Sequence, residues 1–144
     1  MKIRTALASG LLAAVAASAA ADAPPEYLFV SRSSETLMDD ATAKALFDEI
    51  VSAKLARLYP TRTWGFAAQV EGGITQANAC VVVARVMLLP RNQPIITKLL
   101  LFKPQKMATA FDALPNASAA QCKDLAKHKL REANQAMLAA LIPD

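Results

Sequence analysis

The chain has 144 residues and a formal net charge of +4 at pH 7; 54% of its residues are hydrophobic and 19% are charged. This composition excludes an intrinsically disordered chain, which would have fewer hydrophobic residues and a larger net charge. The chain has 4 glycines and 8 prolines, too few for a low-complexity or collagen-like protein.

The beginning of the chain has the three regions of a secretory signal peptide in the expected order. Met1–Arg4 is positively charged, Leu7–Ala20 is an apolar run, and Ala19–Ala21 offers the small residues of a cleavage site. The apolar run is shorter than the roughly 20 residues that a membrane-spanning helix needs. The sequence therefore predicts a signal peptide at 1–21 and a single mature domain at 22–144. We expect this domain to be periplasmic or secreted, without a stable membrane anchor.

Cleavage would also change the charge of the protein. It would remove Lys2 and Arg4 and so lower the net side-chain charge from +4 to +2. This is not the balance of a nucleic-acid-binding domain, which concentrates Lys and Arg on one face. We therefore expect no nucleic-acid partner.

The two cysteines of the chain, Cys80 and Cys122, both remain after cleavage. In an oxidising compartment, an even number of cysteines is most simply explained by a disulfide bond. A zinc site would need further nitrogen or sulfur ligands, and His128 is the single histidine of the sequence. The spacing also excludes a Cys-x-x-Cys redox motif. The sequence thus predicts one structural disulfide, no metal site and no cofactor.

The first elements of the mature chain are predicted from their hydrophobic periodicity. The apolar run at 27–30 predicts a short strand, and apolar residues at helical spacing predict a long amphipathic helix over 37–59. Asp39 and Asp40 could accept hydrogen bonds from the first turn of this helix, and Pro60 would end it.

The period then changes to two, as in strands. Residues 64–70 alternate and predict a half-buried strand that ends in a turn at 71–73. A second strand is expected over 78–89, where both faces are apolar except for Arg85. Another β-rich run follows at 95–102.

The carboxy-terminal part contains one ambiguous segment and one clear helix. Residues 105–114 fit either a short helix or a further strand. Ser118 and Gln121 have the spacing of a capping box, which predicts the start of the last helix. Cys122 lies on the apolar stripe of this helix, so a bond to Cys80 would hold the helix against the sheet.

Together these elements predict an α+β domain in which a small antiparallel sheet of three to four strands packs against two long helices, with one disulfide. Two helices can cover one face of such a sheet, but the second face is also apolar. Its residues on the central strand include Val81, Val83, Met87 and Leu89. We expect this face to be covered by residues 105–114, by the flank of the first strand, by a second copy of the chain or by a ligand.

Residues capable of catalysis have simpler structural explanations. His128 is expected on the solvent-exposed face of the last helix, and no Gly-x-Ser-x-Gly nucleophile motif is present. The carboxylate pairs Asp39–Asp40 and Asp48–Glu49 are sequence neighbours, so on a helix they would point about 100° apart and could not flank one glycosidic bond. We therefore predict no catalytic residues and no enzymatic activity.

Four residues are candidates for binding a partner: Trp64, Phe66, Arg85 and Met87. Aromatic and arginine side chains are common anchors at protein interfaces, although packing in the core is the simpler role for the two aromatic residues. The favoured function is a small exported, non-enzymatic protein-binding module, such as an inhibitor, an immunity protein or an envelope accessory protein. Its partner would be a protein of the envelope or periplasm, and a homodimer through the sheet is a further option. The alternatives are a carrier of an apolar small molecule and a small hydrolase whose site forms only in the fold.

Overall fold

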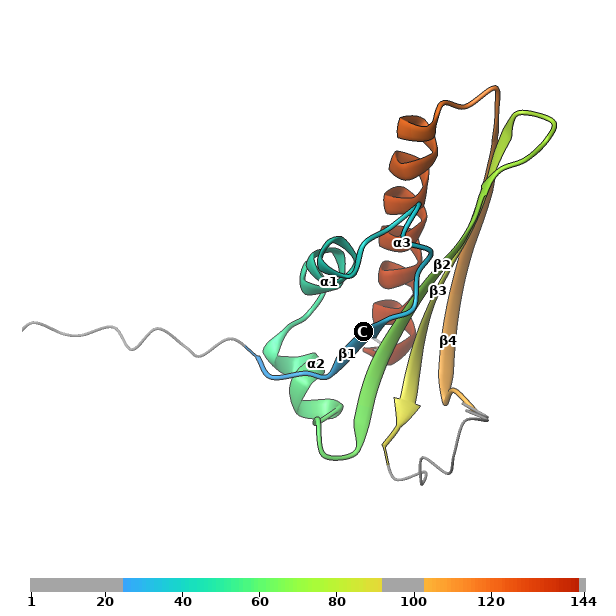
Figure 1. Cartoon of the computed structure of the whole chain (residues 1–144). Coiled ribbons are helices and arrows are strands. Elements are labelled where there is room, and N and C mark those ends of the chain that lie inside the picture. Colours follow the sequence, from blue (N-terminus) through green and yellow to red (C-terminus); the bar gives the residue numbers. More distant parts are fainter. Residues whose placement is uncertain (1–24, 92–102, 143–144) are drawn as a thin grey trace, which may run out of the picture.

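The structure, a computed structural model, describes residues 25–91 and 103–142. In chain order the elements are β1 (Phe29–Ser31), α1 (Asp40–Asp48), α2 (Ala53–Leu58), β2 (Trp64–Ile74), β3 (Ala79–Pro90), β4 (Lys106–Pro115) and α3 (Ala119–Leu141). The four strands form one sheet in the order β1-β2-β3-β4, and the three helices lie against the same face of it (Figure 1). The α+β prediction is confirmed. The strand predicted at 95–102 lies outside the described residues.

The sheet is mixed, so the prediction of a purely antiparallel sheet is wrong in this respect. The strands β2, β3 and β4 are antiparallel neighbours, whereas β1 pairs with β2 in parallel, with Val30 opposite Ala67. Parallel neighbours need a long crossover connection. Residues 32–63, which contain α1 and α2, provide this connection.

The long helix predicted over 37–59 is divided into two short helices, so α3 is the single long helix among the described elements. The side chain of Asp39 caps α1 by accepting a hydrogen bond from the Thr42 backbone N–H. Ser52 caps α2 in the same way, through the Leu55 N–H. A serine that can cap a new helix offers the backbone an alternative to continuing the old one, which accounts for the break.

The turn predicted at 71–73 is also wrong, because β2 continues through Gly72 and Gly73 to Ile74. The two glycines have φ angles of +129° and +145°, which allow the strand to distort while it stays paired with β3. The connection to β3 follows at residues 75–78. There the Asn78 backbone adopts a left-handed φ of +57°, and its N–H donates to the Thr75 carbonyl. The sequence pattern of residues 105–114 fitted either a helix or a strand. In the structure these residues form most of β4.

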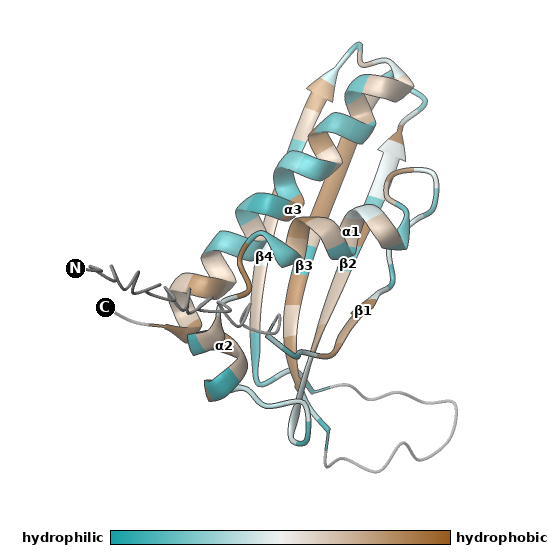
Figure 2. Cartoon of the chain, turned by 90° about the vertical axis from the view of Figure 1, so that its left-hand side faces the viewer, coloured by the Kyte–Doolittle hydropathy of each residue, from teal (hydrophilic) through white to brown (hydrophobic). Residues whose placement is uncertain are grey.

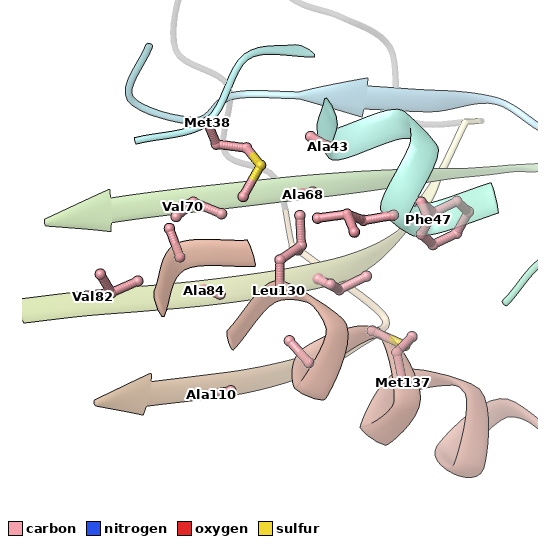
Figure 3. Close-up of a cluster of buried hydrophobic side chains, with 14 of the residues drawn as sticks. Met38, Ala43, Phe47, Ala68, Val70, Val82, Ala84, Ala110, Leu130 and Met137 are labelled. Carbon is pink, nitrogen blue, oxygen red and sulfur yellow. The ribbon is translucent and has the colours of Figure 1, made fainter. Parts of the chain in front are cut away.

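The core lies between the sheet and the helices. Alternate residues of β3 face it, and each is no more than 1% exposed: Cys80, Val82, Ala84, Val86 and Leu88. Figure 2 shows β3 as a mostly hydrophobic strand behind an α3 that is polar on its outer side. Leu130 and Met137 of α3 meet Phe47 of α1 in the same buried cluster (Figure 3).

The disulfide joins this core to its covering helix. Cys80 at the start of β3 is bonded to Cys122 in the first turns of α3, and both are buried. The predicted capping box is present as well, since Ser118 and Gln121 exchange hydrogen bonds between side chain and backbone. The start of α3 is therefore held both by its cap and by a covalent bond to the sheet.

Candidate protein-binding surface

The face of the sheet that points away from the helices is the candidate site. No helix of residues 25–91 and 103–142 lies on this face (Figure 1). On β3, the residues that alternate with the core positions point to it, and all are at least partly accessible to solvent. We call this surface the open face; its β3 residues are Val81, Val83, Arg85, Met87 and Leu89.

One end of the open face is apolar. Ala67 on β2 is in register with Val30 on one side and with Met87 on the other. Gly65 leaves room for the Leu28 side chain, because a Cβ atom at Gly65 would come within 3.1 Å of Leu28 Cδ2. Leu28 and Val30 are 38% and 45% exposed. We call the following four side chains the apolar patch: Leu28, Val30, Met87 and Leu89.

Polar side chains cross the open face beside this patch. Arg85 Nη1 lies 3.3 Å from Glu71 Oε2, and the Gln69 amide donates a hydrogen bond of 2.6 Å to Glu71 Oε1. Both members of the ion pair remain partly exposed, so the pair contributes little to stability. The charges are therefore available for contact with a partner beside an apolar surface.

The margin of the open face is formed by β4, an edge strand of the sheet. Phe111 is 75% exposed and Met107 is 56% exposed. Register places Phe111 beside Val83 and Met107 beside Met87, so both side chains belong to the open face. Phenylalanine is usually buried, and this degree of exposure is a typical feature of an interaction surface.

The structure separates the four residues that the sequence suggested for partner binding. Arg85 and Met87 lie on the open face, whereas Trp64 and Phe66 lie on the helix side of the sheet. Phe66 is 2% exposed and its ring centroid is 4.9 Å from that of Phe47, so it packs in the core, the simpler of the two roles considered for it. Trp64 is half-buried and packs edge-on against a tyrosine ring of the core margin.

The sequence did not identify the exposed residues of this face that lie outside β3. Leu28 and Val30 belong to a four-residue apolar run whose faces are defined only by parallel pairing with β2. Met107 and Phe111 have helical spacing, which concealed their position on one side of a strand. The signal available in the sequence was the spacing of two between Met107, Thr109 and Phe111, which places these residues on one face of a strand.

The groups considered for catalysis have structural roles or lie in solvent. His128 is exposed on α3. The hydrogen bond from the Thr42 backbone N–H lowers the pKa of Asp39, as expected for a carboxylate at a helix N-terminus. Asp48 forms an exposed ion pair of 3.0 Å with Lys44. Within the described part of the chain, no cluster of three or more His, Cys, Asp or Glu residues could hold a metal ion.

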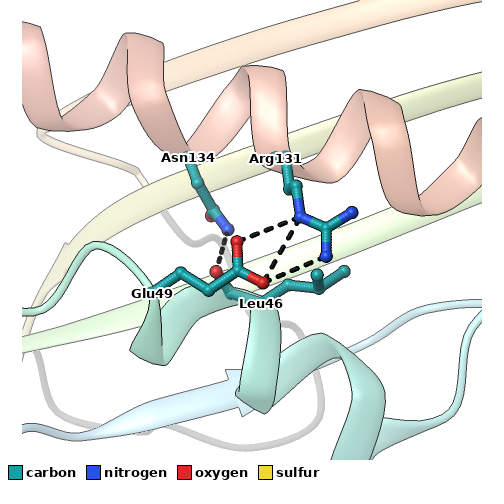
Figure 4. Close-up of polar contacts among 4 residues, drawn as sticks. All are labelled: Leu46, Glu49, Arg131 and Asn134. Carbon is teal, nitrogen blue, oxygen red and sulfur yellow. Dashed lines mark hydrogen bonds and ion pairs between the residues drawn. The ribbon is translucent and has the colours of Figure 1, made fainter.

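A polar contact joins α1 to α3 on the helix side of the molecule (Figure 4). Arg131 donates two hydrogen bonds of 3.0 Å to the carboxylate of Glu49, and these bonds lower the pKa of Glu49. The buried amide of Asn134 donates to the carbonyl of Leu46, near the end of α1 where the helix itself supplies no partner. This contact holds the end of α1 against α3, on the side of the sheet away from the open face; the buried Oδ1 of Asn134 has no hydrogen-bond partner among the described residues.

A second polar contact joins α3 to β4. Lys129 is 9% exposed and forms ion pairs of 3.3 Å with Asp112 and 2.8 Å with Glu132. The pKa of Asp112 is lowered first by the hydrogen bond from the Ala113 backbone N–H and then by Lys129. These charges therefore hold the helix over the edge strand.

A shallow hollow of about 430 Å³ opens between α3 and the segment that joins α1 to α2. Ile50, Leu138 and Ile142 form its apolar part, and Lys54 and Gln135 lie at its polar side. It is open to solvent and lies on the surface, outside the core between helices and sheet. The core between the helices and the sheet is filled by buried side chains, among them Ala68 and Ala84 (Figure 3).

Neither a protein-family model nor a curated protein matches the sequence. One similar solved structure is that of a supposed lipoprotein from Caulobacter crescentus, with 12% sequence identity and a TM-score of 0.36. The match covers 78% of this chain and 86% of the other. At that TM-score the likeness supports no conclusion about fold or function. None of the helices within the described residues is long and apolar enough to span a bilayer.

Proposed function

We propose that this protein is a small exported binding protein that acts without catalysis and docks a protein partner of the cell envelope on its open face. The observation that carries the proposal is the apolar patch. In a protein that kept this face only in contact with water, polar residues would be expected at these alternate positions. Leu28 and Val30 are instead exposed, and Met87 and Leu89 lie across the small residues Gly65 and Ala67 of β2 from them.

The chemistry of the face suits a protein partner. A hydrophobic centre with charged groups at its rim is the usual composition of a protein–protein interface. Here the apolar patch lies next to the Glu71–Arg85 ion pair, in which both side chains are partly exposed. Arginine beside a flexible methionine also fits an interface that adapts to its partner.

Two further features support export. The sequence begins with the three regions of a signal peptide, and the disulfide between Cys80 and Cys122 is of the kind that persists in oxidising compartments. Within this function, the three roles in question are an inhibitor of an envelope hydrolase, an immunity protein against a toxin, and an accessory protein of envelope assembly. The identity of the bound partner distinguishes them.

The test is site-specific photo-crosslinking of the full chain in cells. A photoreactive residue replaces Val30 on the open face, and a matched control replaces Lys123, which is exposed on α3. We expect a covalent adduct with a second protein from position 30 and none from position 123. The same adduct should disappear when Met87→Lys introduces a charge into the patch, while the unfolding midpoint of the variant remains close to that of the wild type.

Three outcomes would contradict the proposal. The first is the absence of any protein adduct at position 30, and the second is an adduct that persists with Met87→Lys. The third is an apolar small molecule that co-purifies with the wild type in native mass spectrometry and is lost with Met87→Lys. That result would favour the carrier function instead.

A further inference from the structure

β4 is a long strand at the edge of the sheet, and its outer side has no strand partner among the described residues. Exposed edge strands are normally protected by proline, by a bulge or by charges that face outward, since otherwise they pair with other chains. Between Lys106 and Pro115 the sequence contains neither proline nor glycine. The open-face side of this strand carries Met107, Thr109 and Phe111, none of them charged.

We propose that β4 pairs antiparallel with β4 of a second copy, so that two four-stranded sheets join into one continuous sheet of a symmetric dimer. This inference goes beyond the binding function, because it uses the backbone edge of β4 and leaves the apolar patch on β1 and β3 uncovered. A two-fold axis at right angles to the sheet preserves its two faces, so the open faces of both copies lie on the same side.

The side chains of β4 select one register for this pairing. With the two-fold axis at Thr109, Lys106 lies opposite the partner's Asp112, and Met107 lies opposite the partner's Phe111. By symmetry each of these pairs occurs twice. Directly opposed cross-strand pairs of opposite charge stabilise a sheet, and a thioether beside an aromatic ring is a favourable contact.

Neighbouring registers lose this complementarity. An axis at Ala110 would place Lys106 opposite the partner's Leu114 and Asp112 opposite the partner's Ala108. An axis at Ala108 would place Lys106 opposite the partner's Ala110. Of these three registers, the one centred on Thr109 is the one that places Lys106 and Asp112, the two charged residues of β4, opposite each other.

The charges concerned are accessible for this role. Lys106 is exposed and makes no ion pair within the described chain. The Asp112 side chain is 51% exposed even though one of its oxygens lies 3.3 Å from Lys129. A carboxylate has two oxygens and about four acceptor positions, so Asp112 can accept from Lys129 and from a second lysine together.

The first experiment reverses the charges. The assay is sedimentation equilibrium of the purified protein over a range of concentrations. We expect a dimer that Lys106→Asp and Asp112→Lys each weaken by roughly tenfold, because like charges then face each other at two symmetric positions. The double variant restores the opposite-charge pairs and should return to within about threefold of the wild-type dissociation constant.

The second experiment tests the register through the axis. In Thr109→Cys the two new thiols of the dimer would lie directly opposite, within the Cα separation of about 4.4–6.8 Å that a disulfide requires. We expect rapid formation of a covalent dimer under mild oxidation. Gln69→Cys, which places a thiol on the same face but on β2, should form such a dimer much more slowly.

Some results would overturn the pairing. A chain that stays monomeric at all concentrations excludes it, and so does a dimer that responds equally to the single and the double charge variants. Thr109→Cys crosslinking no faster than Gln69→Cys excludes this register. Asp112→Lys also removes a contact to Lys129. Urea unfolding of each variant therefore serves as the control that its monomer is folded. None of these results changes the crosslinking that we expect at position 30. The dimer and the binding function are therefore tested separately.

Discussion

Replacement of Gly72 by alanine is the most specific test of the hairpin geometry, with Gly73→Ala as its control. A Cβ atom at Gly72 would lie 1.9 Å from the Val81 carbonyl oxygen and 2.9 Å from the Val81 carbonyl carbon. A Cβ atom at Gly73 would meet nothing within 4 Å. Both positions have a positive φ, so both variants carry backbone strain, but only one carries a collision.

The magnitude follows from these two contributions. Strain at a positive φ costs about 1–3 kcal/mol in each variant. The collision at Gly72 involves backbone atoms, which no change of rotamer can move, and β3 is anchored next to it by the disulfide of Cys80. We therefore expect the end of β2 to separate from β3 at the three paired positions from Gly72 to Ile74. The loss of about three backbone hydrogen bonds at about 0.5–1.5 kcal/mol each adds roughly 2–4 kcal/mol to the cost of Gly72→Ala.

The assay is urea unfolding followed by the fluorescence of Trp64, the one tryptophan of the chain. Trp64 lies at the far end of β2 from the substitutions, so it reports global unfolding of the domain. Gly72→Ala should lower the free energy of unfolding by about 2 kcal/mol or more beyond the effect of Gly73→Ala. Equal effects of the two variants would refute the close approach of Gly72 to β3.

Three further predictions use the same unfolding measurement. Asn134→Ala leaves a buried carbonyl of α1 without its donor and should cost about 1–3 kcal/mol, whereas an unchanged midpoint would contradict the contact. Replacing both Cys80 and Cys122 by serine should cost up to about 4 kcal/mol, because the bond closes a loop across 42 positions; a loss below about 1 kcal/mol would show that the unfolded chain is already compact. The pKa of Glu49 is lowered by Arg131, so ionised Glu49 favours the folded state, and this contribution is lost as the pH falls below 4.5, the ordinary value of the group. Glu49→Gln should therefore make stability depend less on pH in this acid range, and identical pH profiles for variant and wild type would contradict the ion pair.

The features that were predictable from the sequence are those fixed by local spacing. The alternation along β3 correctly gave the buried series from Cys80 to Leu88. The spacing of Ser118 and Gln121 correctly gave the start of α3. The disulfide followed from the even number of cysteines and from the position of Cys122 on the apolar stripe of α3.

The features that were not predictable depend on contacts between distant segments. Residues 37–59 have one helical stripe, but the cap at Ser52 divides them into two helices that pack separately. Met107 and Phe111 have a spacing that suits a helix, and their segment is a strand because the exposed edge of β3 pairs with it. β1 became a parallel strand only through its register with β2, which no local pattern encodes.

The candidate site was predictable only in part, for the same reason. The sequence correctly placed Arg85 and Met87 on the second face of β3, because the period of two separates the faces of a strand. It kept Phe66 as a candidate as well, although packing in the core was the simpler role, because an aromatic residue in a strand can serve either a core or an interface. The distinction needs the position of the helices, which cover the Phe66 side of β2 and not the other.

Because the helices of the described residues all lie on one face of the sheet, the other face stays accessible for binding. A chain of this length forms two layers, so a sheet covered by helices on one face exposes the other unless a partner binds there. If the open face served only solubility, Met87 and Leu89 could be polar without loss, because their side chains do not reach the core on the helix side. Their apolar character instead adds a hydration cost to the isolated monomer. Covering this face would remove that cost, so the hydrophobic effect favours its burial by a partner.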